Sequence, residues 1–169
     1  GGQTALRALL AHGEVYSVAV ADCGCHDNRV DKMWWNEQWM GYPVDASAYD
    51  AASNVLQARA LRDDQRLMLV VGELDENVDP ACTLQVAGAL QAQEKDFELL
   101  MVMGKGHSAA DTNYGRRKLL AFFQKHLHLD RQRQARDEGP LQNEPGPSRQ
   151  WGPAPAAADE DPEKAAVEE

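Results

Sequence analysis

The chain has 169 residues, enough for one domain with a sizeable hydrophobic core. Its 27 acidic and 17 basic residues give a formal net charge of -10, which argues against general nucleic-acid binding because that needs basic patches. No apolar run reaches the roughly 18 residues of a membrane span, so we expect no transmembrane segment in this chain. Three cysteines are too few, and odd in number, for a disulfide-stapled scaffold.

The first elements predicted along the chain are a helix, a strand and an aromatic insert. Residues 3–12 carry alanines and leucines at helical spacing, and Gly13 is placed to end that helix. Residues 15–21 (VYSVAVA) are short, β-branched and apolar, as in a buried strand. Residues 30–40 contain three Trp and end at Gly41. We expect at least one of these Trp side chains to pack in the core.

The elements predicted next alternate between strand and helix. They are a strand over 66–72, a helix supplied by 81–93 with Pro80 suited to its first turn, a strand over 97–103, and a helix capped by Asp111 or Thr112 that runs to about Leu127. We expect His126 and His128, at the end of the last helix, to be solvated. The alternation predicts an α/β fold with a parallel sheet.

Apolar periodicity ends before the last forty residues of the chain. Six of the eight prolines lie in this part, and residues 150–169 carry six acids and one base. Such a composition cannot bury enough apolar surface to become ordered. We therefore divide the chain into a folded part, 1–129, and a disordered acidic Pro/Ala-rich tail, 130–169.

Two loops that follow predicted strands carry side chains of catalytic type. Asp75 follows the strand 66–72, and His107 lies in a Gly-rich loop after the strand 97–103. Either residue alone is commonly structural, but an acid and a histidine on successive strand ends match the last two members of a Ser-Asp-His triad. In such a triad the histidine moves the proton of the serine, and the aspartate holds the imidazole in the correct tautomer.

The nucleophile of that triad is expected before the first residue of this chain. Gly1 and Gly2 run directly into a helix, as a nucleophile elbow does after its serine, although such a pair can equally be a cloning remnant. In a Ser-x-Gly-Gly arrangement the serine lies two positions before Gly1. We expect the chain to be incomplete at its N-terminus and inactive alone, because it lacks the serine and the neighbouring oxyanion-hole N–H.

A cluster of soft donors, Cys23, Cys25 and His26, invites a zinc interpretation that we reject. The three donors are too crowded for one tetrahedral ion without partners elsewhere, and Cys82 is the only other thiol. We interpret them as small buried groups at a strand end and predict neither a metal nor another cofactor.

Four stretches resemble the C-terminal part of the catalytic domain of the prolyl oligopeptidase family of serine peptidases, nearest its dipeptidyl-peptidase-IV-like branch. They are GGQTALRALL, HDNRVDKMWWNEQWMGYP, LVVGELDENVDP and MVMGKGHSAA, and they cover roughly residues 1–128. WWNEQWMG and GELDENV are the most distinctive strings. The resemblance implies the C-terminal portion of an α/β-hydrolase fold and a parent protein that hydrolyses peptide bonds, after proline or a small residue, through an acyl-enzyme.

The same resemblance implies roles for four residues. Asp75 and His107 match the family's triad aspartate and histidine. Asn77 matches an asparagine that, in the dipeptidyl-peptidase branch, helps hold the backbone carbonyl of the substrate. Trp35 falls where that branch has an aromatic wall of its proline-accepting pocket, usually a tyrosine. A secreted or periplasmic parent with peptide substrates is implied, although cytoplasmic members exist, and a homo-oligomeric parent is compatible with the resemblance.

Two other functions stay open at this point. An esterase would use the same triad, and a β-propeller upstream would argue for the peptidase instead. A non-catalytic hydrolase-like module that binds partners through its acidic tail would have a residue other than serine two positions before Gly1.

Overall fold

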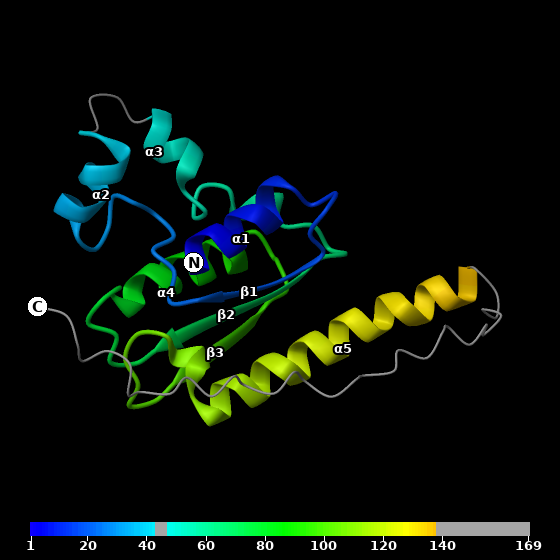
Figure 1. Cartoon of the computed structure of the whole chain (residues 1–169). Helices are drawn as coiled ribbons and strands as arrows, with labels where there is room; N and C mark the ends of the chain where they lie inside the picture. Colours follow the sequence, from blue (N-terminus) through cyan, green and yellow to red (C-terminus); the bar gives the residue numbers. More distant parts are fainter. Residues whose placement is uncertain (43–46, 138–169) are drawn as a thin grey trace, which may run out of the picture.

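The computed structural model describes residues 1–42 and 47–137, with side chains up to residue 127. Its elements are α1 (Gly2–Ala11), β1 (Val18–Asp22), α2 (Met33–Met40), α3 (Ser47–Ala52), the 3-10 helix η1 (Ala58–Ala60), β2 (Arg66–Gly72), α4 (Pro80–Ala92), β3 (Glu98–Val102), the 3-10 helix η2 (Ala109–Asp111) and α5 (Asn113–Asp137). The strands form one parallel sheet in the order β1-β2-β3, as Figure 1 shows. The predicted α/β class is therefore confirmed.

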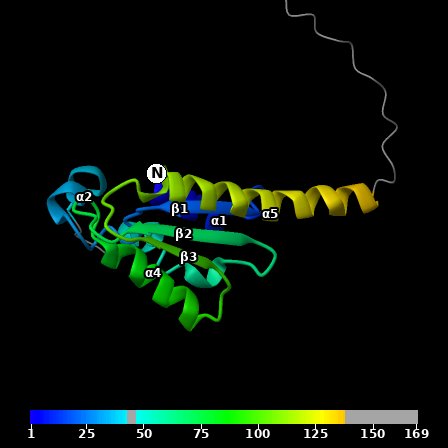
Figure 2. The same ribbon diagram turned by 90° about the horizontal axis from the view of Figure 1, so that it is seen from below.

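Strand β2 lies at the centre of the sheet and is buried on both faces. Leu67 and Leu69 point to one face, where they pack with α1 and α4, and Met68 and Val70 point to the other, where they pack with α5. Figure 2 shows α4 and α5 on opposite sides of the sheet. Burial on both faces explains why the sequence of β2 is a continuous apolar run rather than an alternating one.

The three strands end close together, which sets the place of the site. Asp22 at the end of β1 pairs with Val70 of β2, and Val102 at the end of β3 pairs with Gly72 of β2. Because the strands are parallel, the loops that follow them leave from the same edge of the sheet. The residues just after Asp22, Gly72 and Val102 are thereby brought together.

One predicted strand start differs from that in the structure, and one of the two predicted caps of the last helix is confirmed. β1 begins at Val18 rather than at Val15, because the amides of Val15 and Tyr16 both donate to the His12 carbonyl oxygen at 2.9 Å in the turn that ends α1. Thr112 is the capping residue of α5, since its Oγ1 accepts from the Gly115 amide at 2.9 Å.

Helix α5 continues to Asp137, beyond the expected end near residue 127 and across the division made after residue 129. Residues 138–169, most of the predicted tail, lie outside the described residues. In the part of the chain that the structure describes, none of the helices is both long and apolar enough to cross a membrane.

An insert between β1 and β2 carries α2 and α3. Arg29 ties it together, with Nη2 at 2.7 Å from Asp27 and Nη1 at 2.6 Å from Asp50. The hydrogen bond from Arg29, with a further one from Ser53 Oγ at 2.7 Å, lowers the pKa of Asp27 to about 2. Tyr49 is buried and donates to the Gly41 carbonyl oxygen at 2.7 Å. The insert is therefore a structured unit beside the sheet edge.

Candidate active site

The loops after β2 and β3 bring Asp75 and His107 into direct contact. The Nδ1 atom of His107 lies 2.9 Å from Oδ2 of Asp75. The Asp75 side chain is fully buried, whereas the His107 side chain is 39% exposed. One ring edge of the histidine is thus held by a carboxylate, and the ring remains accessible to solvent.

The surroundings of Asp75 favour its ionised form. Its Oδ1 atom accepts from the amides of Asn77 at 2.9 Å and Val78 at 3.0 Å. Burial by itself raises the pKa of Asp75, but the hydrogen bonds from these two amides and from two neighbouring side chains outweigh it, so its pKa lies below the ordinary value. The sequence Asp-x-Asn-Val therefore folds the loop around its own carboxylate.

The two loops touch at Gly72, the last residue of β2. A Cβ atom there would overlap the Gly106 carbonyl oxygen and lie 2.5 Å from that of Lys105. The Leu74 amide donates to the Lys105 carbonyl at 2.9 Å, and the Gly104 amide donates to the Glu73 carboxylate at 2.8 Å. Because residue 72 has no side chain, the loop after β3, which carries His107, packs directly on the loop after β2, which carries Asp75.

Cys23, the first residue after β1, is the third polar side chain at this edge. Its Sγ atom and the ligating atoms of Asp75 and His107 all lie within 4.8 Å of one another. The thiol is buried and lies 3.2 Å from Asp22 Oδ1. Burial raises the pKa of Cys23 to about 11, so the thiol is protonated at neutral pH. Cys23 was not assigned to this site from the sequence, although its position directly after a strand is the signal that identified the other two.

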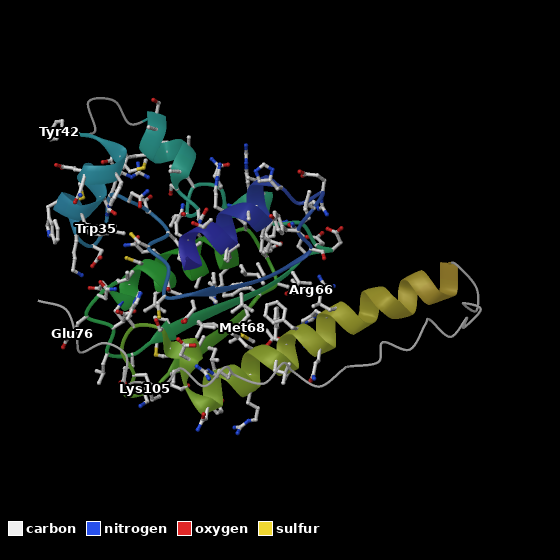
Figure 3. All side chains as sticks on the ribbon, viewed as in Figure 1. Trp35, Tyr42, Arg66, Met68, Glu76 and Lys105 are labelled. Atoms are coloured by element: carbon white, nitrogen blue, oxygen red, sulfur yellow. The ribbon has the colours of Figure 1, made fainter. Side chains whose placement is uncertain are left out.

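A cleft of about 1020 Å³ opens over this edge. It is lined by, among others, Gly1, Gly2, Cys23, Trp35, Asn77 and His107. Three of the four predicted site residues therefore border one cleft, and the fourth, Asp75, lies buried beneath His107. Figure 3 shows Glu76 and Lys105, which flank the site, at one end of the sheet, and Arg66 toward the opposite end.

The aromatic residues of α2 face solvent and the cleft, so the expectation that one of them packs in the core is wrong. Trp34, Trp35 and Trp39 are 68%, 50% and 68% exposed, and all three line the cleft. They pack on one another, with ring centroids 6.1 Å apart for Trp34 and Trp35 and 5.9 Å apart for Trp35 and Trp39. Only Asn36 of this helix is buried. The helix therefore offers an aromatic wall.

Lys32, just before α2, joins this wall to the aspartate loop. Its Nζ atom donates to the carbonyl oxygens of Glu76, at 3.1 Å, and Asn77. Nothing in the sequence marks Lys32 as special, because its partners are backbone atoms more than forty residues away.

The Cys23-to-His26 cluster is dispersed in the structure. Cys25 Sγ donates to the Asp27 carbonyl at 3.4 Å, and His26 is fully buried with Nδ1 at 3.2 Å from Asn54 Nδ2. Burial lowers the pKa of His26 to about 4.

The expectation that His126 is solvated is wrong. The His126 side chain is buried and packs against Phe122 of the same helix, α5, with ring centroids 4.6 Å apart. The side chain of His128 lies outside the described residues.

Comparisons with known proteins find similar structures among dipeptidyl peptidases. Dipeptidyl peptidase 4 of Porphyromonas gingivalis is 26% identical, with a TM-score of 0.64 over 77% of this chain and 18% of its own. A protein assigned as dipeptidyl aminopeptidase IV of Bacteroides ovatus is 19% identical, with a TM-score of 0.67 over 73% of this chain and 18% of its own. The chain thus spans less than a fifth of either structure. No curated protein matches it.

These likenesses confirm the predicted α/β-hydrolase fold, with its parallel sheet flanked by helices. The family model of the prolyl oligopeptidases, peptidase family S9, matches residues 1–130. Since that match includes all three strands and every loop that borders the cleft, the chain belongs to the prolyl oligopeptidase family.

Proposed function

We propose that the parent protein is a serine peptidase in which Asp75 and His107 act with a serine two residues before Gly1. The observation that carries this proposal is the 2.9 Å contact between His107 Nδ1 and Asp75 Oδ2, with a buried carboxylate and a solvent-accessible imidazole. A structural ion pair has no need of an exposed ring edge at the mouth of a cleft. A general base requires one.

In the proposed reaction, Asp75 fixes His107 with its proton on Nδ1, which leaves Nε2 free to accept the serine proton. The serine oxygen attacks the carbonyl carbon of the peptide bond. The imidazolium then returns the proton to the leaving amine as the C–N bond breaks and an acyl-enzyme forms. Water hydrolyses the ester by the same steps, and the ionised state of Asp75 stabilises the imidazolium in both halves.

The start of α1 supports the proposed position of the nucleophile. Gly1 and Gly2 line the same cleft as His107. A Cβ atom on Gly2 would overlap the Asp22 carbonyl oxygen and lie 2.8 Å from the Gly24 amide nitrogen, so the helix start lies against the loop after β1. A serine just before this point would enter the cleft from the end of a strand, as in a nucleophile elbow.

For the substrate, we propose a peptide whose proline or small residue lies against Trp35, with its backbone carbonyl near the Asn77 amide group. Both residues border the cleft. A tryptophan is larger than the tyrosine usual in the dipeptidyl-peptidase branch, so it narrows the pocket and favours compact side chains. Preference for peptides over simple esters separates this proposal from an esterase.

A serine-directed fluorophosphonate tests the mechanism in the intact protein. We expect His107→Gln to abolish labelling and Asp75→Asn to slow it by roughly 10³–10⁴-fold. Glu76→Gln, a charge change at the exposed neighbour of Asp75, serves as the control and should label like the wild type.

The 169-residue chain alone should remain unlabelled. Labelling of that chain, or an Asp75→Asn variant that labels at the wild-type rate, would refute the proposed triad.

Three further expectations stay predictions: a division of the chain into 1–129 and a disordered tail, a secreted or periplasmic location, and a homo-oligomeric parent. α5 crosses the first boundary, and the family match ends at residue 130.

A further inference from the structure

Three different metal-ligating side chains meet at the floor of the cleft and directly beneath it. They are the thiol of Cys23, the carboxylate of Asp75 and the imidazole of His107, whose ligand atoms all lie within 4.8 Å of one another. They come from three separate loops, one after each strand of the sheet. Such a trio is not part of the proposed peptidase chemistry, which needs only the carboxylate and the imidazole.

The donor set and its spacing suit a thiophilic divalent cation. Zinc binds thiolate, imidazole and carboxylate at about 2.0–2.3 Å, which places the donor atoms of a tetrahedral site roughly 3.3–3.6 Å apart. The Asp75 and His107 atoms are 2.9 Å apart, and no pair in the group exceeds 4.8 Å, so movements of about 1 Å bring all three onto one ion.

Charge and access favour the same ion. A thiolate and a carboxylate together neutralise a divalent cation, and the two acidic donors are buried while His107 is exposed to the cleft. The ion can therefore enter past the imidazole and keep a water as its fourth ligand. Magnesium and calcium prefer oxygen ligands and are poorly matched to a thiol and an imidazole.

We propose that Cys23, Asp75 and His107 form an inhibitory site for a thiophilic divalent cation such as Zn²⁺. On binding, the Cys23 thiol loses its proton to solvent as the metal–sulfur bond forms. His107 coordinates through Nδ1, and its single proton moves to Nε2. The Asp75 carboxylate binds the ion in place of the imidazole N–H.

The expected consequence is loss of general-base catalysis. With the proton on Nε2, His107 has no lone pair with which to accept the proton of a nucleophile, and Asp75 no longer orients the ring. This consequence rests on the proposed function, but the binding of the ion does not. The two can therefore be tested separately.

Cobalt(II) substitution reports on binding without any assay of activity. Co²⁺ added to the intact protein should produce a thiolate-to-cobalt charge-transfer band in the near ultraviolet that Zn²⁺ removes. Cys23→Ser should lose the band. Cys25→Ser is the matched control, because Cys25 borders the same cleft but belongs to no such group among the described residues, and it should keep the band. Circular dichroism establishes that both variants are folded.

Inhibition is measured as the Zn²⁺ concentration that halves the hydrolysis rate, each variant being compared with its own rate without metal. We expect this concentration to rise at least about tenfold in Cys23→Ser and to stay within about twofold in Cys25→Ser. Absence of the band in the wild type, or a band retained in Cys23→Ser, would overturn the site. A band that behaves as expected in a protein without hydrolase activity would uphold the site and refute the proposed function.

Discussion

Replacing Gly72 by alanine should disturb the site without touching any reactive side chain. The new Cβ atom would overlap the Gly106 carbonyl oxygen and lie 2.5 Å from the Lys105 carbonyl oxygen. Both are backbone atoms, so neither can rotate away as a flexible side chain would. Since ordinary contact begins at 3.4 Å, the loop after β3 must withdraw by almost 1 Å or more.

That displacement sets the size of the expected effect. Overpacking of this kind destabilises a protein by about 1–3 kcal/mol. His107 directly follows Gly106, so the shift lengthens its 2.9 Å contact with Asp75. A misplacement of about 1 Å at a catalytic group lowers the rate roughly 10²-fold. We therefore expect kcat/KM to fall about a hundredfold, with a larger effect on kcat than on KM.

The assay is steady-state hydrolysis of a proline-containing peptide by the intact protein, together with thermal unfolding. Gly88→Ala is the matched control, because Gly88 is exposed in α4 and a Cβ atom there meets nothing within 4 Å. It should keep full activity and stabilise the helix by about 0.5–1 kcal/mol. A Gly72→Ala variant with wild-type kcat/KM would show that the relative position of Asp75 and His107 does not depend on the close contact between the two loops at Gly72.

Two further predictions concern the insert. Trp35→Ala should raise KM for proline-containing peptides about tenfold, because one apolar subsite contributes about 1–3 kcal/mol to binding. Trp34→Ala should raise KM less, and equal effects of the two substitutions would contradict a specific role for Trp35. The pKa of His26 is about 4 in the folded protein and near 6.5 in the unfolded chain. As the pH falls from 6.5 toward 4, the unfolded chain therefore binds a proton that the folded protein does not, and the free energy of unfolding decreases. Urea unfolding of the intact protein should show a loss of about 3 kcal/mol over this range that is absent in His26→Gln, and the same loss in both would refute this origin.

The sheet and the contact between Asp75 and His107 were predictable because one rule covers both. Apolar runs identify parallel strands, and the carboxyl ends of such strands meet at one edge. Asp75 and His107 each follow a strand directly, so their proximity required no knowledge of side-chain contacts.

The remaining features depend on contacts between distant parts of the chain. Proximity in the sequence groups Cys23 with Cys25 and His26, whereas its partners in space, Asp75 and His107, are more than fifty and eighty residues away. The three Trp side chains of α2 indicate that this helix has an apolar surface, but they do not indicate whether that surface packs in the core or borders a cleft. For His126, burial depends on how α5 is turned toward the sheet, which a short stretch of sequence does not determine.

The two hydrogen bonds of Lys32 tie the start of α2 to the backbone of the loop that carries Asp75. In the proposed peptidase, a substrate side chain that pushes α2 outward would also pull, through Lys32, on the carbonyls of Glu76 and Asn77, and the amide of Asn77 donates to the Asp75 carboxylate. We therefore expect a poorly fitting substrate residue to lower both the affinity and the turnover of the proposed peptidase. On the same reasoning, we expect a redesign of α2 for another substrate to keep its turnover only if Lys32 is preserved.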